Sequence, residues 1–212
     1  MKYEISIRIN LPEEITKVLQ EEKQRFVVQY GSSYKSEPHI TLYLESYTRE
    51  EYPKLLEALH TLPIKPFSIT LLPAEIRSEE HRHRNLYVVE ITNKESVHAL
   101  HNTIKEIADK YRSPFIREKL LARIKEKGLE ADGTRAHFET LNWQEESFDP
   151  HITLGEIAFG KPQADIKEVR KNIASIKGKQ IEVTNITVFF YEKKEGAEKY
   201  ALMEKTTIPL GK

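Results

Sequence analysis

The pentapeptide Pro-His-Ile-Thr-Leu occurs twice in this chain, at residues 38–42 and again at residues 150–154. The chain has 212 residues and eight histidines, and this one repeated segment holds two of the eight. Around each copy, the hydrophobic pattern predicts the same order of elements: strand, helix, Pro-His-Ile-Thr-Leu strand, helix and strand. A repeated order of elements indicates a duplicated architecture, so we expect an α+β protein built from two related halves.

The expected boundaries come from turn residues, helix caps and changes between strand and helix periodicity. In the first half, strands are expected at 3–10, 38–44 and 67–76, and helices at 12–28 and 48–62. In the second half, strands are expected at 86–92, 151–157, 181–191 and 200–208, and helices at 94–111 and 165–176. Residues 77–85 are expected to form a charged loop between the halves.

No linker rich in proline, glycine and serine separates the halves, so we expect one domain over residues 1–212. Its lobes are expected at about residues 1–84 and 85–212. We expect a two-lobed, pseudo-two-fold duplicated domain, with antiparallel sheets that face a central cleft and helices outside.

The second lobe carries an insertion at about residues 113–147. Ser113-Pro114 and Gly128 are suited to begin and end a helix there. Its apolar residues, Ile116, Leu120 and Ile124, are spaced to pack one face against the domain. The rest of the insertion, which includes Trp143, is expected to be a loop that either shapes the site or covers a sheet edge.

Alternate residues of a strand share a face, so each repeated segment is expected to present a histidine beside a threonine. These residues are His39 and Thr41 in the first copy and His151 and Thr153 in the second. The plainer interpretation is a pair of half-buried strands with polar outer faces, but the repeat of all five letters favours a shared function. A third His-x-Thr, at residues 101–103, falls in a predicted helix, and we interpret it as a chance match.

Two imidazoles and two hydroxyls that face each other across a cleft are suited to the chemistry of a phosphodiester. One histidine, when neutral, takes a proton from the attacking oxygen, and the other, when protonated, gives one to the leaving oxygen. The threonine hydroxyls donate hydrogen bonds to non-bridging oxygens, where charge develops in the transition state. An imidazole with a pKa of about 6.5 serves either role near neutral pH, so this chemistry requires no metal or other cofactor.

Two His-x-Thr motifs, one in each lobe of a duplicated α+β domain, resemble the 2H phosphoesterase superfamily, which includes 2′-5′ RNA ligase-like proteins and RNA 2′,3′-cyclic phosphodiesterases. The resemblance implies that His39, Thr41, His151 and Thr153 are catalytic. It also implies an enzyme that opens 2′,3′-cyclic phosphates of RNA ends or small nucleotides to a 2′-phosphate. The ligase-like branch often carries an arginine where this chain has Glu156, and a carboxylate there repels phosphate, which weighs against ligation.

The alternatives are a 2′-5′ RNA ligase, a module that binds RNA or nucleotides in the same cleft without turnover, or a scaffold whose partner docks on the insertion. Five further residues are candidates for substrate binding: Tyr43, Tyr191, Arg77, Arg82 and Arg84. The tyrosines are suited to stack on a base or to pack in the fold, and the arginines to contact flanking phosphates or to lie in a solvated loop. His81 and His83 have no cysteine or carboxylate at ligand spacing, so we expect no metal site.

The composition limits the possible partners. Lys plus Arg is 33 and Asp plus Glu is 33, so the formal charge is zero, which argues against binding long nucleic acid by bulk charge. The absence of cysteine excludes disulfides and fits a cytoplasmic setting. No apolar run approaches the ~20 residues of a membrane span. We therefore expect RNA ends or small cyclic nucleotides as the partners, with no membrane contact and no sign of a protein partner.

Overall fold

The computed structural model of the protein describes residues 2–34, 36–141 and 148–211. In these ranges, eight strands pair antiparallel into a single sheet, in the order β6-β3-β4-β5-β2-β1-β7-β8. The strands are β1 (Lys2–Asn10), β2 (His39–Tyr47), β3 (Phe67–Glu79), β4 (Arg84–Ile91), β5 (Ile152–Ala158), β6 (Gln180–Val183), β7 (Asn185–Lys193) and β8 (Ala201–Pro209). The helices are α1 (Glu13–Tyr30), α2 (Glu51–Leu59), α3 (Lys94–Ala108), α4 (Glu118–Glu126), α5 (Arg135–Thr140) and α6 (Ile166–Asn172), with 3₁₀ turns η1 (Glu80–Arg82) and η2 (Ala174–Ile176). The expected α+β class is confirmed.

One sheet serves both halves of the fold, which corrects the expectation of separate sheets. The two strands with the repeated segment, β2 and β5, are neighbours at its centre and join through one residue pair, Ile40 and Ile152. We call this junction the seam. On either side of it the order runs outward as β5-β4-β3-β6 and β2-β1-β7-β8.

The two halves of the sheet are not the two halves of the chain. β3 precedes the expected lobe boundary at residue 84, yet it pairs with β4 and β6. The last two strands, β7 and β8, return to pair beside β1. The sheet therefore crosses the expected boundary, because each half of it combines strands from before and after that boundary.

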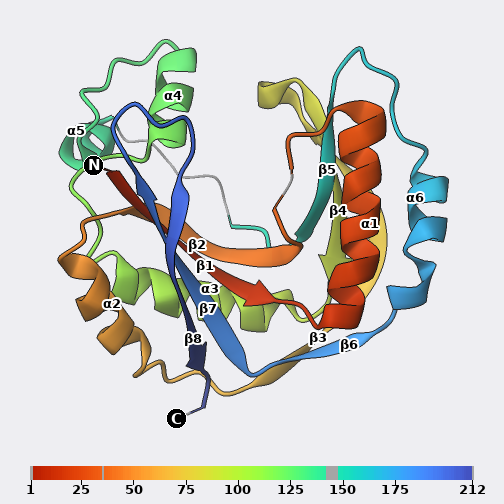
Figure 1. The fold of residues 1–212 in the computed structure, drawn as a ribbon, viewed down its shortest axis with the longest axis horizontal. Helices are drawn as coiled ribbons and strands as arrows, with labels where there is room; N and C mark the ends of the chain where they lie inside the picture. The colour runs from red at the N-terminus through yellow and green to blue at the C-terminus, as the bar shows by residue number, and fades with distance from the viewer. Residues whose placement is uncertain (1, 35, 142–147, 212) are drawn as a thin grey trace.

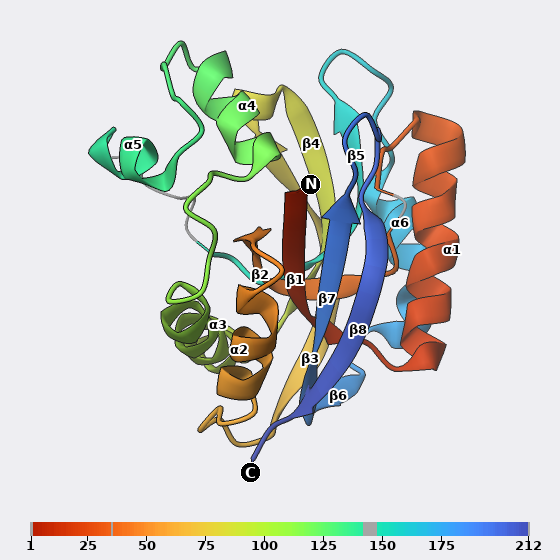
Figure 2. The same ribbon diagram turned by 60° about the vertical axis from the view of Figure 1, so that its left-hand side comes forward.

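Helices cover one face of the sheet, as Figures 1 and 2 show for α1, α3 and α6 along its outside. α1 packs behind β5, α3 behind β2 and α6 behind β3, while α2 packs on α3. In α3, the fully buried Val97, Leu100 and Ile104 recur at the spacing of one helix face. The opposite face of the sheet, which we call the open face, carries Thr41 and Thr153. Within the described ranges, no helix is long and apolar enough to cross a membrane.

Both central strands carry a bulge directly after the threonine of the repeated segment. The register shifts at Leu42 in β2 and at Leu154 in β5, the same letter of the two copies. A bulge adds one residue that has no partner across the ladder, and strict alternation of faces stops there. Strict alternation would place Tyr43 on the same face as Thr41, but after the bulge Tyr43 turns to the helix-covered face, where it is 8% exposed.

The described part of the insertion contains two helices, α4 and α5, and a small hydrophobic core of its own. Ile116, Leu120 and Ile124 pack with Phe138 of α5 instead of against the main core, which corrects the expected packing. The helix α4 begins at Glu118 and not at Pro114, and Gly128, with φ of 72°, follows its end as expected. α5 lies where only a loop was expected, and Trp143 lies outside the described residues.

The segment expected to be a charged loop is instead the tip of a hairpin. Residues 77–79 extend β3, η1 makes the turn, and Arg84 already belongs to β4. Cross-strand pairing continues to Glu79 and Arg84, so Arg77 is a strand residue that faces the open face with its partner Leu86. Elsewhere, the strand expected at 181–191 is two strands, β6 and β7, that separate at Thr184 and pair with different neighbours.

Candidate functional site

The seam brings the two His-x-Thr motifs together on the open face. Ile40 and Ile152 pair antiparallel, and both are fully buried in the core. Residues that flank such a pair point to the other face. His39 therefore comes level with Thr153, and Thr41 with His151, so an imidazole and a hydroxyl from each half share one patch.

His39 begins β2, and its ring is oriented by its own chain. Nδ1 lies 2.6 Å from the carbonyl oxygen of Glu37, and Nε2 lies 3.1 Å from Oγ1 of Thr41. A carbonyl oxygen only accepts, so Nδ1 carries a hydrogen and donates it. Nε2 is consequently the nitrogen available for proton exchange, and it lies beside the hydroxyl of Thr41.

His151, which directly precedes β5, is held in the same way. Its Nδ1 lies 2.7 Å from the carbonyl oxygen of Asp149, which again assigns the hydrogen to Nδ1 and leaves Nε2 available. Nη1 of Arg77 also lies 3.0 Å from Nδ1. Two donors do not hydrogen-bond each other, so Arg77 acts on this ring as a neighbouring charge.

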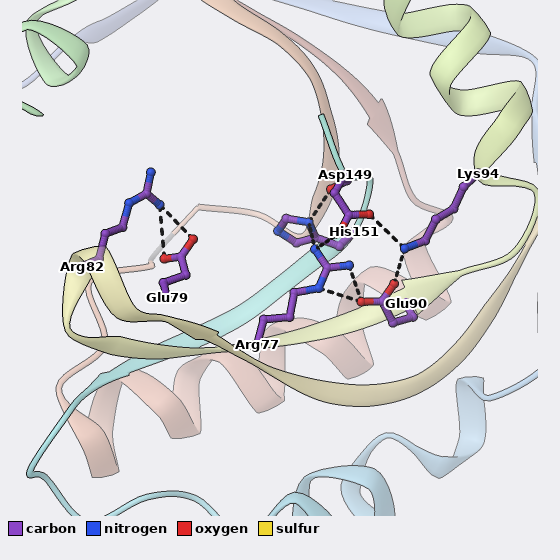
Figure 3. A network of polar contacts seen from close by, with 7 residues as sticks. All are labelled: Arg77, Glu79, Arg82, Glu90, Lys94, Asp149 and His151. Carbon is purple, nitrogen blue, oxygen red and sulfur yellow. Dashed lines mark hydrogen bonds and ion pairs between the residues drawn. The ribbon is translucent and has the colours of Figure 1, made fainter. Parts of the chain in front are cut away.

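Arg77 belongs to a network of charged residues beside His151 (Figure 3). Its guanidinium pairs with Glu90 and, at 2.7 Å, with Oδ2 of Asp149. Nζ of Lys94 pairs with the same two carboxylates, at 2.7 Å and 2.9 Å respectively. The network ties β3, β4 and α3 to Asp149, whose carbonyl orients the histidine. Among the described residues, no group of three or more His, Asp or Glu side chains is arranged to hold a metal ion.

The surroundings favour neutral imidazoles in the free protein. Burial, followed by the charge of Arg8, lowers the pKa of His39 from 6.5 to about 4. Burial also lowers the pKa of His151, where the hydrogen bond to the Asp149 carbonyl opposes the shift and Arg77 reinforces it. A bound phosphate has the opposite effect, because negative charge favours the imidazolium.

Arg8 is a site residue that the sequence analysis did not identify. It pairs with Thr41 in register and points to the same face. Its Nε donates to Oγ of Ser6 at 2.7 Å, its Nη2 donates to the hydroxyl of Tyr191 at 3.1 Å, and its guanidinium lies 4.5 Å from the ring centre of Phe189. No carboxylate of the described chain pairs with it, so its charge is available to an anion. The sequence does contain a signal for Arg8, because it lies between Ile7 and Ile9 in an alternating strand and so is predicted to point away from the core.

Lys23 of α1 is a second cation that the sequence analysis did not identify. It is 2% exposed, and its Nζ donates to the carbonyl oxygen of Thr153 at 3.0 Å. Burial, followed by the charge of Arg8, lowers its pKa from 10.5 to about 8. The sequence signal for Lys23 was its helical spacing from Leu19 and Phe26, which places it on the buried face of α1.

The third His-x-Thr has a structural place that mirrors this lysine. His101 lies on α3, and its Nδ1 donates to the carbonyl oxygen of Leu42 at 2.6 Å. Its ring also stacks on Phe148, with centres 3.9 Å apart. In each half of the sheet, a basic side chain from the helix behind the central strand thus donates to a backbone carbonyl at the bulge, Lys23 in β5 and His101 in β2.

The two tyrosine candidates lie apart. Tyr191 is on the open face, where its hydroxyl accepts from Arg8 and its ring stacks with Phe189 at 6.3 Å. Tyr43 is on the helix side, where its hydroxyl donates to Oδ1 of Asp109 at 2.8 Å. Tyr191 therefore lies beside Arg8 on the open face, whereas Tyr43 lies in the core.

The arginine candidates at the hairpin are engaged by carboxylates. Nη1 of Arg82 lies 3.1 Å from Oε1 of Glu79, and Nε of Arg84 lies 2.5 Å from the other oxygen of that carboxylate. Arg84 also pairs with Glu156, which accepts a hydrogen bond from Ser33 as well. The negative charge of Glu156 near the motifs is thus compensated within the protein.

Comparison with known proteins places this geometry in a family. A model of the 2′-5′ RNA ligase superfamily matches residues 12–195. Apo E. coli LigT is 14% identical, with a TM-score of 0.56 and 99% of both chains covered. The protein TT0787 of Thermus thermophilus is 19% identical, with a TM-score of 0.57 and 98% of both chains covered.

At such low identity these two structures show a common fold, a curled antiparallel half-barrel with outer helices. No curated protein sequence matches the chain significantly. The family model spans most of the chain, including both His-x-Thr motifs, and it names the superfamily that these motifs resemble. The chain therefore belongs to the 2′-5′ RNA ligase superfamily of 2H phosphoesterases.

Proposed function

We propose that this protein is a cyclic phosphodiesterase that opens 2′,3′-cyclic phosphates of RNA ends or small nucleotides and leaves a 2′-phosphate. The proposal rests on one observation, the meeting of two His-x-Thr motifs about the pair Ile40 and Ile152. E. coli LigT, which shares the fold, was crystallised with phosphate and with 3′-AMP. Both ligands carry a phosphate group, as the proposed substrate does.

In the proposed reaction, the neutral imidazole of one histidine takes a proton from water, and the water oxygen forms a bond to phosphorus. The bond from phosphorus to the 3′-oxygen breaks, and the other histidine, as imidazolium, protonates that oxygen. The bond to the 2′-oxygen remains, so the product is a 2′-phosphate with a free 3′-hydroxyl. Each histidine ends in the protonation state in which the other began, and proton exchange with solvent restores the pair.

The remaining polar groups of the patch stabilise the charge on phosphorus oxygens. The hydroxyls of Thr41 and Thr153 donate to the two non-bridging oxygens. Arg8 adjoins Thr41 and has no carboxylate partner among the described residues, and Lys23 adds positive charge behind Thr153. An anionic substrate supplies the negative charge that these two cations lack in the free protein, and it raises the pKa of the imidazole that acts as the acid.

Turnover of adenosine 2′,3′-cyclic phosphate, followed by phosphorus NMR, tests the proposal. We expect the cyclic phosphate signal to be replaced by that of the 2′-phosphate, at the same rate in EDTA. Accumulation of the 3′-phosphate would contradict the order of bond breaking. Loss of activity in EDTA, restored by zinc or manganese, would contradict the two-histidine mechanism.

The same samples separate the alternative functions. Binding of the nucleotide without turnover would favour a binding module. Joining of an RNA 2′,3′-cyclic phosphate end to a 5′-hydroxyl end through a 2′-5′ bond, with no hydrolysis, would favour a ligase.

A further inference from the structure

A large cavity lies beside the two motifs, towards the far end of β5. Its volume is 890 Å³, and its walls are the end of α1, the β3–β4 hairpin, the last turns of α4 and the turn after β5. Of the described residues that line it, none belongs to the two His-x-Thr motifs. A cavity of this size exceeds the needs of one phosphate and falls within the ~300–1,000 Å³ of pockets for ligands as large as a nucleotide.

Positive charge is concentrated in this cavity. Its cationic lining residues are Arg82, Arg84, Arg123, Lys127 and Lys161. Two carboxylates, Glu126 and Glu156, line it with them, and Glu79 pairs with the hairpin arginines from the side. Among the described residues, these five cations compare with three carboxylates when Glu79 is counted, although the whole chain is balanced at 33 of each sign. The local excess favours an anionic ligand.

The cavity is connected to the motifs by β5. Glu156, which lines the cavity, is three residues after Thr153 on the same strand, a distance of ~10 Å along it. An RNA whose terminal cyclic phosphate lies at the seam therefore carries further phosphates within reach of the cavity. Tyr30 also lines the cavity, and grooves that combine cations with aromatic residues are a common means of holding a single strand.

Two of the cavity cations come from the insertion. Arg123 and Lys127 are four residues apart at the end of α4, so they lie on the same side of the helix. The insertion is anchored to the sheet by a buried ion pair, in which Nη2 of Arg135 lies 2.5 Å from Oε2 of Glu45 in β2. The cavity wall is thus fixed in position relative to the strand that carries His39.

We infer that this cavity is a subsite for the nucleotides that precede the terminal cyclic phosphate, so that an oligoribonucleotide and not a free nucleotide is the preferred substrate. The inference rests on the proposed function, because that function places the reacting phosphate at the seam. It assigns to the insertion the part of substrate recognition that lies away from the reacting bond.

The test compares two substrates in native protein and in the double variant Arg123→Gln with Lys127→Gln. Point variants are preferable to deletion, because α4 shares its small core with Phe138 of α5. The substrates are adenosine 2′,3′-cyclic phosphate and an oligoribonucleotide of about six residues that ends in the same group. We expect kcat/KM for the oligoribonucleotide to fall at least about tenfold, through lost remote binding, with the value for the nucleotide within about twofold.

Lys125→Gln is the control for loss of charge outside the cavity, because it removes one positive charge from an exposed position of α4 that does not line the cavity. It should leave both values unchanged. The salt dependence gives a second readout. We expect a plot of log kcat/KM for the oligoribonucleotide against log salt concentration, between about 50 and 200 mM, to be shallower in the double variant by about 0.7 for each phosphate contact removed. Equal losses on both substrates, or no preference of the native protein for the oligoribonucleotide, would overturn the inference.

Binding separates this inference from the proposed function. Fluorescence anisotropy with an unreactive oligoribonucleotide that ends in a 3′-phosphate requires no turnover. Weaker binding by the double variant, with native binding by Lys125→Gln, supports the subsite whatever the fate of the cyclic phosphate. Equal binding by all three proteins would overturn the subsite even where the cyclic nucleotide is hydrolysed.

Discussion

The carbonyl oxygen two residues before each histidine orients its ring, from Glu37 for His39 and from Asp149 for His151. The residue between them is proline in both copies, whose fixed φ stiffens the turn. The isoleucine after each histidine is fully buried at the seam, and the leucine after each threonine is the bulged residue. Every letter of the repeated pentapeptide therefore has a physical role in placing one imidazole and one hydroxyl.

The threonine hydroxyls should matter to the rate and little to the fold. Thr41→Val and Thr153→Val each remove one donor to a non-bridging oxygen, and we expect kcat to fall about 10²-fold in each. Thr41 is exposed, so the free energy of unfolding should be nearly unchanged in its variant. Thr41→Ser, which keeps the hydroxyl, is the control. Native turnover in both valine variants would exclude the threonines as donors.

The charge of Arg8 should be detectable in the titration of His39. Arg8→Met keeps the length of the side chain and removes the cation that, after burial, does most to lower this pKa. We expect the pKa of His39 in the free protein to rise from about 4, yet to remain below 6.5 because the ring stays buried. Histidine-ring NMR across pH measures it. An unchanged or lower pKa would show that Arg8 does not act on this ring.

At the scale of elements, periodicity predicted most of the fold's parts. The order of strands and helices around both repeats, including α1 and α3, is as expected, because long amphipathic segments carry strong periodic signals. Short elements were missed where the pattern was weak, as in the six-residue α5 and the break at Thr184 between β6 and β7. The hairpin from Arg77 to Arg84 was predicted to be a loop because its sequence is highly charged. In the fold some of these charges pair across the two strands, as Glu79 does with Arg84, and the sequence alone does not show such pairing.

In the candidate site, the meeting of the two motifs was predictable from the sequence, and the residues around them were not. His39, Thr41, His151 and Thr153 follow from the repeat, since each pair is local to one strand. Arg8 and Lys23 reach the same patch only because β1 pairs with β2 and α1 packs behind β5, and these are contacts between distant segments. The misplacement of Tyr43 has a local cause, the bulge at Leu42, which has no distinct sequence signal.

The contact between α1 and β5 leaves no room for a side chain at Gly155. A Cβ built there would lie 2.5 Å from the ring of Phe26, closer than packed atoms approach. Gly155→Ala must therefore displace the strand or the helix, and we expect the free energy of unfolding to fall by about 1–3 kcal/mol. Urea unfolding measures the loss. The displaced strand carries Thr153, so kcat should also fall, and native stability in this variant would contradict the close packing described here.

At the scale of the molecule, the two halves are interlocked by exchange of elements. α1 lies between β1 and β2 in the chain but packs behind β5, and α3 lies between β4 and β5 but packs behind β2. β7 and β8 complete the first half from the end of the chain. Each motif is thus supported by segments of both halves, which keeps the two imidazoles in a fixed relation.

The lowered pKa of His39 should appear in the stability of the whole molecule. As pH falls through 6.5 the unfolded chain gains a proton on this residue, whereas the folded chain does not until about 4. Stability contributed by the neutral ring is therefore present above 6.5 and is lost as pH falls towards about 4. In urea unfolding over this window, His39→Gln should lose less stability than the native protein. An equal loss in both would mean that His39 titrates normally.

Turnover of a nucleoside 2′,3′-cyclic phosphate by His39→Ala, His151→Ala and the double variant tests the central claim most directly. Each single variant should lower kcat by about 10²–10⁴, equal to about 3–5.5 kcal/mol of barrier, because each removes the acid or the base. The double variant should lose far less than the product of the two, because the imidazoles act as a unit. Retention of most of the native turnover by either folded single variant would contradict the account.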